Sequence, residues 1–174
     1  MATLRMEPAF QEALWAHLLP KDDGREQGAF LFCSFGHFNG ERVFQIRAFL
    51  FLERNDFNEQ ASDYLELSDA KRVDVIKRAH ALGASLVEFH SHPGPWPAAF
   101  SLADQRGLRE TVPHMWWRLK GRPYLAAVVA PCSFDALVWQ NNPHEPEPLT
   151  GIAVGNRLLT PTNASLGGWT DGYC

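Results

Sequence analysis

The chain has 174 residues, of which 45% are hydrophobic and 21% are charged, and this fits one globular domain that buries about two-thirds of its unfolded surface. A formal net charge of −4 argues against a nucleic-acid-binding surface, which would be basic. The three cysteines are an odd number and form no Cys-x-x-Cys pair, which is typical of a reducing cytoplasm. The N-terminal segment has no uninterrupted apolar core, as a signal peptide would, and no apolar run approaches the ~20 residues that span a bilayer. We therefore expect a cytoplasmic protein without a membrane segment.

The first third of the chain predicts one helix followed by a long hairpin. Apolar residues recur at helical spacing over residues 8–19, where a proline follows and ends the pattern. The dipeptide Asn39-Gly40 then separates two apolar runs at residues 28–38 and 42–52, and this dipeptide is typical of a tight β-hairpin turn. Because the first run is almost entirely apolar, we expect it to be buried on both faces.

The middle of the chain predicts a helix between two short strands. A polar loop at residues 54–59 leads to a short strand at 64–67. Ser68 can cap the helix, and Gly83 can end it in a left-handed conformation. The apolar residues 84–89 that follow predict the next strand.

The remaining elements alternate between one interrupted helix and further strands. A helix begins at Ser101, and Pro113 should break it before it continues through Trp116 and Trp117. We expect both tryptophans in the core. Strands are expected at 124–130, 134–140 and 152–159, with a Pro- and Glu-rich link at 141–148 and a tail at 167–174.

Two histidines and an aspartate stand at fixed spacing between a predicted strand and a predicted helix. The motif is His90-x-His92-Pro93, then seven residues, then Ser101-x-x-Asp104. Residues two apart on a strand point to one face, so His90 and His92 are aimed together, and Pro93 ends the strand because it cannot donate to a ladder. Imidazole nitrogen and carboxylate oxygen suit Zn²⁺, whose catalytic sites take three protein ligands. The spacing therefore predicts a Zn²⁺ site formed by His90, His92 and Asp104.

Each part of the motif also has a purely structural interpretation. Two histidines can share a strand face without a metal, and His17 lies on the apolar face of the first helix, where we expect it to pack. Ser101 and Asp104 form the pattern of a capping box, in which each side chain binds the other's backbone N–H. From the residues alone, helix cap and metal ligand both remain open for Asp104.

The full motif resembles that of the JAMM (MPN+/JAB) zinc metalloproteases, over roughly residues 7–140. In that family a glutamate about sixty residues before the first histidine completes the site, and Glu26 lies 64 residues before His90, with Ala29 where the family usually has glycine. The resemblance implies an α/β fold: a single-domain JAB/MPN-like (cytidine-deaminase-like) mixed curved sheet flanked by helices. It places the metalloprotease domain at residues 1–140 and leaves residues 141–174 as a C-terminal linker that can include an extra strand and a tail.

The resemblance also implies an enzyme with Zn²⁺ as its cofactor. Such an enzyme is a zinc-dependent isopeptidase or peptidase that cleaves after the C-terminal tail of a ubiquitin-like protein by metal-activated water. Glu26 would act as the general base, and Ser101 would donate a hydrogen bond to the developing oxyanion. Glu88, on the same strand face as His90 and His92, is the rival base or a partner that orients a ligand histidine.

The implied partners are a ubiquitin-like protein or its conjugates, together with homologues of activating and conjugating enzymes, as in sulfur-carrier metabolism or antiphage conjugation systems. Neither nucleic acid nor a membrane is expected as a partner. Two other functions stay open. One is a zinc amidohydrolase acting on a small-molecule or short-peptide amide, and the other is a catalytically silent MPN-type scaffold, although such scaffolds normally lack the ligands that this chain has.

Overall fold

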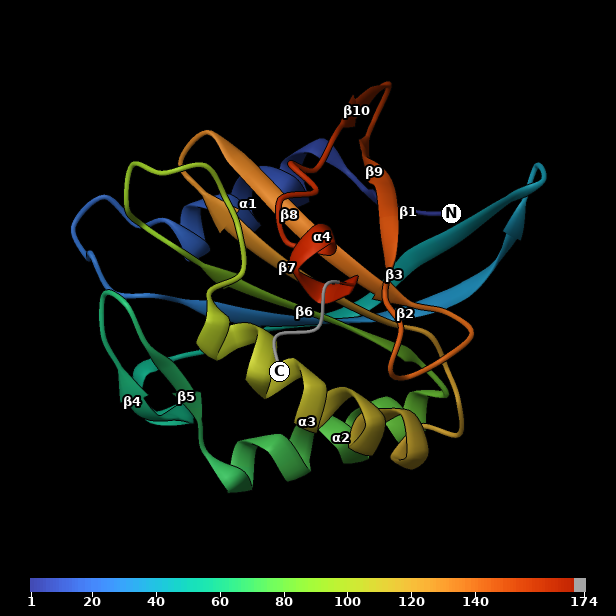
Figure 1. Cartoon of the computed structure of the whole chain (residues 1–174), viewed down its shortest axis with the longest axis horizontal. Helices are drawn as coiled ribbons and strands as arrows, with labels where there is room; N and C mark the ends of the chain where they lie inside the picture. Colours follow the sequence, from blue (N-terminus) through green and yellow to red (C-terminus); the bar gives the residue numbers. More distant parts are fainter. Residues whose placement is uncertain (171–174) are drawn as a thin grey trace.

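The computed structural model describes residues 1–170, which form a mixed eight-stranded sheet with helices on both faces (Figure 1). Neighbouring strands follow the order β1-β3-β2-β6-β7-β8-β9-β10, and β4 and β5 make a separate two-stranded sheet. The helices are α1 (Pro8–Leu18), α2 (Asp69–Leu82), α3 (Leu102–Arg118) and α4 (Leu166–Thr170). The strands are β1 (Ala2–Met6), β2 (Gly28–Phe38), β3 (Glu41–Phe51), β4 (Phe57–Gln60), β5 (Leu65–Leu67), β6 (Ser85–Ser91), β7 (Tyr124–Ala130), β8 (Ser133–Trp139), β9 (Glu147–Val154) and β10 (Arg157–Leu159).

Strand β1 closes the sheet on itself. It pairs in parallel with β3 on one side and with β9 on the other, so the two ends of the strand order meet. The strand is too short for a clear alternating pattern, and no turn residues separate it from α1, which is why the sequence did not predict it. The remaining pairings are antiparallel apart from β6–β7, and the predicted α/β fold with a mixed curved sheet is confirmed.

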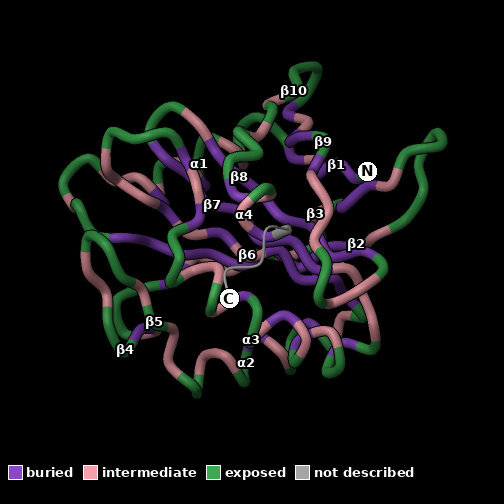
Figure 2. Tube along the Cα trace, viewed as in Figure 1, coloured by how far each residue is buried: buried purple, intermediate pink, exposed green. Residues whose placement is uncertain are grey.

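Each face of the sheet buries its own hydrophobic core. Helices α2 and α3 cover one face and α1 covers the other (Figure 1), and their side chains belong to the two separate cores. The most deeply buried trace runs through the central strands (Figure 2). Along β6, Leu86 belongs to the first core and Val87 to the second, because successive residues of a strand point to opposite faces. No helix among residues 1–170 is long and apolar enough to span a membrane.

Several local predictions are confirmed by their turn and cap geometry. The β2–β3 hairpin turns at Asn39 and Gly40, which have φ of 50° and 82°, and both values lie in the left-handed region that this turn requires. Ser68 caps α2 by accepting a hydrogen bond from the Lys71 backbone N–H, and Gly83 ends the helix with φ of 60°.

The predicted break at Pro113 is wrong, because α3 continues through this residue. The buried stripe of Leu108, Val112 and Met115 runs on both sides of the proline, so packing on the sheet outweighs the backbone hydrogen bond that proline cannot make. Trp117 was expected in the core and is instead 72% exposed. The polar loop expected at residues 54–59 is also partly wrong, since it runs into strand β4.

The C-terminal part adds two strands and a short helix. The single strand predicted at 152–159 is two strands, β9 and β10, because the chain turns at Gly155, which has φ of 58°. The predicted tail begins with α4, in which Trp169 is only 6% exposed and packs edge-on against Trp139. Residues 171–174 of that tail lie outside the described part of the chain. The domain boundary at residue 140 stays a prediction, but strands from both sides of it share one sheet.

Candidate metal centre

The structure brings the three predicted metal ligands together at the end of β6 and the start of α3. His90 Nε2 lies 3.2 Å from His92 Nε2 and 3.4 Å from Asp104 Oδ2. His92 Nε2 lies 3.2 Å from the same Asp104 oxygen. Two imidazole nitrogens and one carboxylate oxygen therefore converge on a single point, and this group can hold a metal ion.

The local fold explains why the two imidazoles face the same way. Strand β6 is paired on both sides, with β2 and β7, and the ladder extends to the His92 N–H, which donates to the Val129 carbonyl. His90 and His92 therefore keep the side-chain alternation of a strand, and Ser91 between them points inward and is fully buried. Pro93 then turns the chain away from the sheet.

The loop from Pro93 to Phe100 is fixed by residues that come much later in the chain. The Ala98 N–H donates to the Ser133 hydroxyl, and the Phe100 N–H donates to the Ser165 hydroxyl, both over 2.8 Å. The Thr162 hydroxyl donates to the Ala98 carbonyl, also over 2.8 Å. These contacts set where α3 begins, and so they set the distance between Asp104 and the histidines.

Asp104 combines the two roles that its sequence context left open. Its Oδ2 accepts a 2.7 Å hydrogen bond from the Ser101 N–H, while the Ser101 hydroxyl accepts a 3.1 Å bond from the Asp104 N–H. The predicted capping box is therefore present, and the capping oxygen is the one that faces both histidines. The cap fixes the carboxylate where a metal would need it.

The spacing of the three donor atoms fits a small tetrahedral cation. Bonds of about 2.0–2.2 Å from zinc to nitrogen and oxygen place two ligands of a tetrahedron about 3.3 Å apart. The three observed separations are 3.2, 3.4 and 3.2 Å. Imidazole and carboxylate ligands suit zinc, and they also bind other divalent transition metals. The donor set and its spacing therefore agree with the metal that the sequence predicts.

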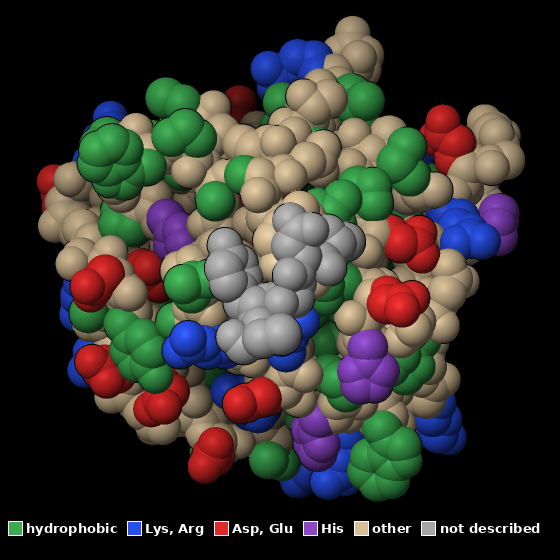
Figure 3. All heavy atoms as spheres, in the orientation of Figure 1, with side chains coloured by type: hydrophobic (Ala, Val, Ile, Leu, Met, Phe, Trp, Pro, Cys, Tyr) green, Lys and Arg blue, Asp and Glu red, His purple; other side chains and the backbone are tan. Residues whose placement is uncertain are grey.

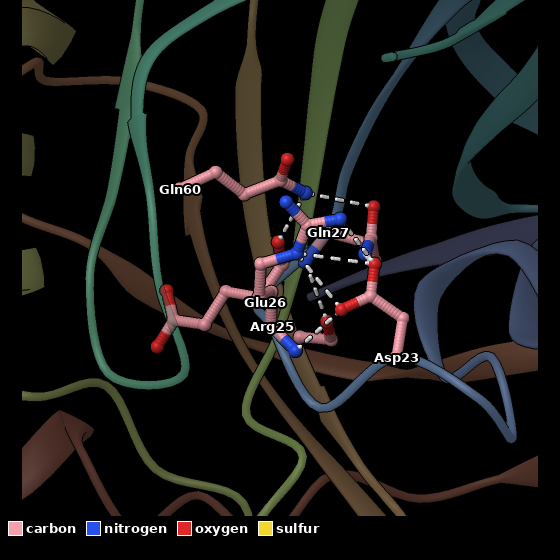
Figure 4. A network of polar contacts seen from close by, with 6 residues as sticks. Asp23, Arg25, Glu26, Gln27 and Gln60 are labelled. Atoms are coloured by element: carbon pink, nitrogen blue, oxygen red, sulfur yellow. Dashed lines mark hydrogen bonds and ion pairs between the residues drawn. The ribbon is translucent and has the colours of Figure 1, made fainter. Parts of the chain in front are cut away.

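Glu26 completes the group from the segment just before β2. The residue is only 4% exposed, and its Oε1 lies 3.5 Å from His92 Nε2. Its backbone is pinned on both sides: its N–H donates to the Ala61 carbonyl over 2.7 Å, and its carbonyl accepts from the Gln60 side chain over 2.9 Å. In Figure 4 the Glu26 carboxylate points away from this polar network, which leaves it free to face the histidines.

The neighbouring residue, Gln27, ties this segment to β6. Its N–H donates to the Ser91 hydroxyl, and its carbonyl accepts from the Ser91 N–H. Its side chain also bridges Gln60 and Asp23, and Asp23 is itself paired with Arg25 (Figure 4). The residues on either side of Glu26 thus fix its position relative to the strand that carries the histidines.

The electrostatics of the group favour a bound cation. Burial raises the pKa of Glu26, and the charges of His90 and His92 work against this shift. Burial would also raise the pKa of Asp104, but its hydrogen bonds with His90 and His92 hold it well below its usual range. Burial alone would lower the pKa of His90, yet the hydrogen bond and charge of Asp104 raise it overall. Asp104 is therefore an anion at neutral pH, and it stabilises positive charge at this point, on His90 or on a bound ion.

Comparison with known protein families identifies one match. The model of prokaryotic homologues of the JAB domain matches residues 8–139. The chain belongs to this family. The match runs from α1 to the end of β8 and includes all of the predicted site residues. No curated protein matches the chain.

The structure also shows an arrangement in this JAB-domain homologue that the sequence did not predict. Glu88 accepts a hydrogen bond from the Tyr124 hydroxyl across the β6–β7 pair, whereas no described hydrogen bond joins it to His90 or His92. Glu88 and His90 interact through charge, and the expectation that Glu88 orients a ligand histidine stays a prediction. The partner could not be read from the sequence, because it lies 36 residues away on a strand whose side chains otherwise read as uniform core.

A cavity of about 390 Å³ adjoins the metal ligands, between the β4–β5 hairpin and α3. His90, Ser101 and Asp104 line one end of it, and β5 lines another side. The candidate metal centre therefore opens into a groove large enough for part of a ligand. His17 lies near this end of the sheet as well. Its Nε2–H donates to the Gly28 carbonyl and its ring stacks on Phe51, so it packs as predicted.

Proposed function

We propose that this JAB-domain homologue is a zinc-dependent isopeptidase or peptidase that cleaves after the C-terminal tail of a ubiquitin-like protein. The observation that supports this most strongly is the convergence of His90, His92 and Asp104 within 3.4 Å of one another, with the buried Glu26 carboxylate beside them. In this proposal His90, His92 and Asp104 hold the metal. When bound, zinc supplies a Lewis acid that polarises the amide carbonyl and lowers the pKa of water to about 7.

Glu26 moves the proton in the proposed reaction. A buried carboxylate with a raised pKa is suited to accept a proton near neutral pH and then release it. Oε1 of Glu26 would take a proton from the attacking water and give it to the leaving amine nitrogen. As the C–N bond breaks, the proton on that nitrogen allows a neutral amine to leave, and the oxygen of the water stays on the acyl carbon.

Ser101 stabilises the charge that develops on the carbonyl oxygen. Its hydroxyl oxygen accepts from the Asp104 N–H, which leaves the hydroxyl hydrogen free to donate. The residue is exposed and lines the cavity next to His90. One such donor typically contributes about 3 kcal/mol to the transition state.

The groove beside the metal centre supports an extended peptide as the substrate. Among residues 1–170, β5 pairs with β4 alone, so its other edge is open for main-chain hydrogen bonds. An extended tail can add to such an edge whatever its sequence. A ubiquitin-like tail matches this requirement better than a compact small-molecule amide, and activating- and conjugating-enzyme homologues are the accompanying partners that we propose.

A panel of substrates tests the proposal. The purified protein should contain about one zinc per chain, cleave ubiquitin-like fusions directly after the modifier, and leave small aryl amides intact. A chelator should abolish the activity, and added zinc should restore it. Cleavage of the small amides alone would replace the proposal by the amidohydrolase alternative, and a zinc-loaded protein inert toward the whole panel would favour the scaffold.

A further inference from the structure

The cavity beside the metal centre has a polar floor that the proposed reaction does not use. Glu88 and Arg72 line it from β6 and α2, next to His90. Apolar side chains form part of the walls: Phe57, Leu65, Leu67 and Leu108. A pocket with apolar walls and a charged end fits a long side chain that has an apolar stem and a polar head.

The Glu88 carboxylate is held in one orientation. The buried Tyr124 hydroxyl donates to Oε2 from the core side. No described residue donates to the other oxygen, Oε1, and Glu88 lines the cavity. One oxygen is therefore fixed by the fold. The second makes no described hydrogen bond and is available to a ligand donor, with the charges of His90 and Arg72 nearby.

The rim of the cavity is negatively charged, like the Glu88 carboxylate inside it. Asp63, Glu66 and Glu110 are exposed and line it, and Arg72 is the one basic side chain in the lining. If the metal ligand Asp104 is left aside, the cavity lining contains four carboxylates, those of Asp63, Glu66, Glu88 and Glu110, and one guanidinium, that of Arg72. On this face of the molecule, Asp and Glu side chains lie over the β4–β5 hairpin and the adjoining helices, with Lys and Arg side chains between them (Figure 3). This field attracts a cationic group and repels an acidic one.

The distance of Glu88 from the metal ligand His90 indicates which residue of a bound peptide would reach the pocket. Glu88 and His90 are two residues apart on one strand, so their side chains lie about 7 Å apart on one face. An extended peptide covers this distance with about two residues. We infer that Glu88, held by Tyr124, is a specificity-determining residue that binds the cationic side chain of a basic residue about two positions from the cleaved amide. This inference rests on the proposed function for its place in the reaction, but the binding itself can be measured separately.

The side chain of arginine fits the pocket best. Its planar guanidinium offers several donors, so it can bind Glu88 Oε1 and a rim carboxylate together. Lysine offers a point charge with the same sign, and it should bind more weakly. Citrulline has nearly the same shape as arginine without the charge, and it provides the matched control ligand.

Binding is tested by NMR titration of the full chain with N-acetylarginine amide. The backbone amides of residues 63–67 and 107–111 should shift and saturate. N-acetylcitrulline amide should bind at least about tenfold more weakly, since hydrogen bonds to charged groups contribute about 1.5–3 kcal/mol. Glu88→Gln should strongly reduce the difference between the two ligands, leaving only what the rim carboxylates contribute, whereas Glu41→Gln, which changes an exposed carboxylate on the β2–β3 hairpin, should keep it.

Two further variants keep the outcomes separate. If Glu88→Gln does not fold, the double variant Glu66→Gln/Glu110→Gln on the exposed rim should still weaken arginine binding several-fold. Glu26→Gln should leave arginine binding unchanged even though the proposed function requires it to lose cleavage, so failure of the reaction and failure of the pocket are distinguishable. Equal affinity for arginine and citrulline in the unmodified protein, or an unchanged difference in Glu88→Gln, would overturn the inference.

Discussion

Two glutamates flank the candidate metal centre, and their surroundings differ. Glu26 is buried and Glu88 is half-buried at the cavity, and burial raises the pKa of each. The Glu26 side chain has no hydrogen-bond donor within the described residues and lies 3.5 Å from His92, whereas the Glu88 carboxylate is fixed by Tyr124. A base must be free to take and release a proton, while a recognition group must stay in place. The comparison assigns the first role to Glu26 and the second to Glu88.

The largest expected effect comes from removing the ion on which both roles depend. Asp104→Asn should lower the zinc content from about one per chain to well below half and abolish cleavage, because a neutral amide replaces the anionic ligand. Metal analysis and an activity assay measure both results. Asp69→Asn is the matched control, since Asp69 is an exposed carboxylate in the first turn of α2, and it should change neither.

The next effect separates the two glutamates directly. Glu26→Gln should lower kcat by about 10³-fold, within the range of lost general acid–base catalysis, while zinc stays bound. Glu88→Gln should leave kcat nearly unchanged on a substrate without basic residues. Steady-state kinetics on one such substrate compare the variants, and the reverse order of effects would exchange the assigned roles.

Ser101→Ala tests the proposed oxyanion donor. We expect kcat to fall by about 10²-fold through the lost donor, and the free energy of unfolding to fall by about 1 kcal/mol through the lost cap. Ser68→Ala removes the corresponding cap of α2, so it should show the same loss of stability with full activity. Equal activity of the two variants would restrict Ser101 to capping.

The acid limb of the pH profile reports on Glu26. The base must be ionised, and its pKa lies above the ordinary glutamate value of 4.5 because of burial. Activity should therefore fall as the pH decreases, with a midpoint above 4.5, and protonation of the histidines in acid acts in the same direction by competing with metal. A kcat profile that stays flat down to pH 4.5 would contradict the assignment.

The smallest effect on the reaction is expected for Tyr124→Phe. The variant leaves a buried carboxylate with one hydrogen bond fewer, which costs about 1–3 kcal/mol of folding free energy. Zinc content and kcat on an uncharged substrate should stay close to those of the unmodified protein. A denaturation curve and a metal assay check this, and loss of zinc would show that Glu88 and Tyr124 support the metal ligands after all.

The parts of the site that the sequence predicted are those built from short-range patterns. His90 and His92 share a strand face, and Ser101 and Asp104 share one helical turn, so spacing alone places each pair. Bringing Glu26 beside them depends on the pairing of β2 with β6, and the family resemblance, not the spacing, indicated it. Tyr124 gave no signal, because a tyrosine at the start of an apolar strand looks like any other core residue.

In the overall fold, too, the sequence predicted local features and missed those that depend on distant residues. The hairpin at Asn39-Gly40 and the capped helix α2 follow from local turn and cap residues. The continuity of α3 through Pro113 and the closure of the sheet by β1 depend on packing and pairing with distant residues. Local patterns could not predict either feature, because neither is decided within a few residues of the chain.

The central claim is that His90, His92 and Asp104 bind one divalent ion. An anomalous difference map recorded at the zinc absorption edge from crystals of the zinc-loaded protein tests it most directly. The account predicts one peak about 2.0–2.2 Å from His90 Nε2, His92 Nε2 and Asp104 Oδ2. A map without a peak at this point, or with zinc bound at other side chains, would contradict it.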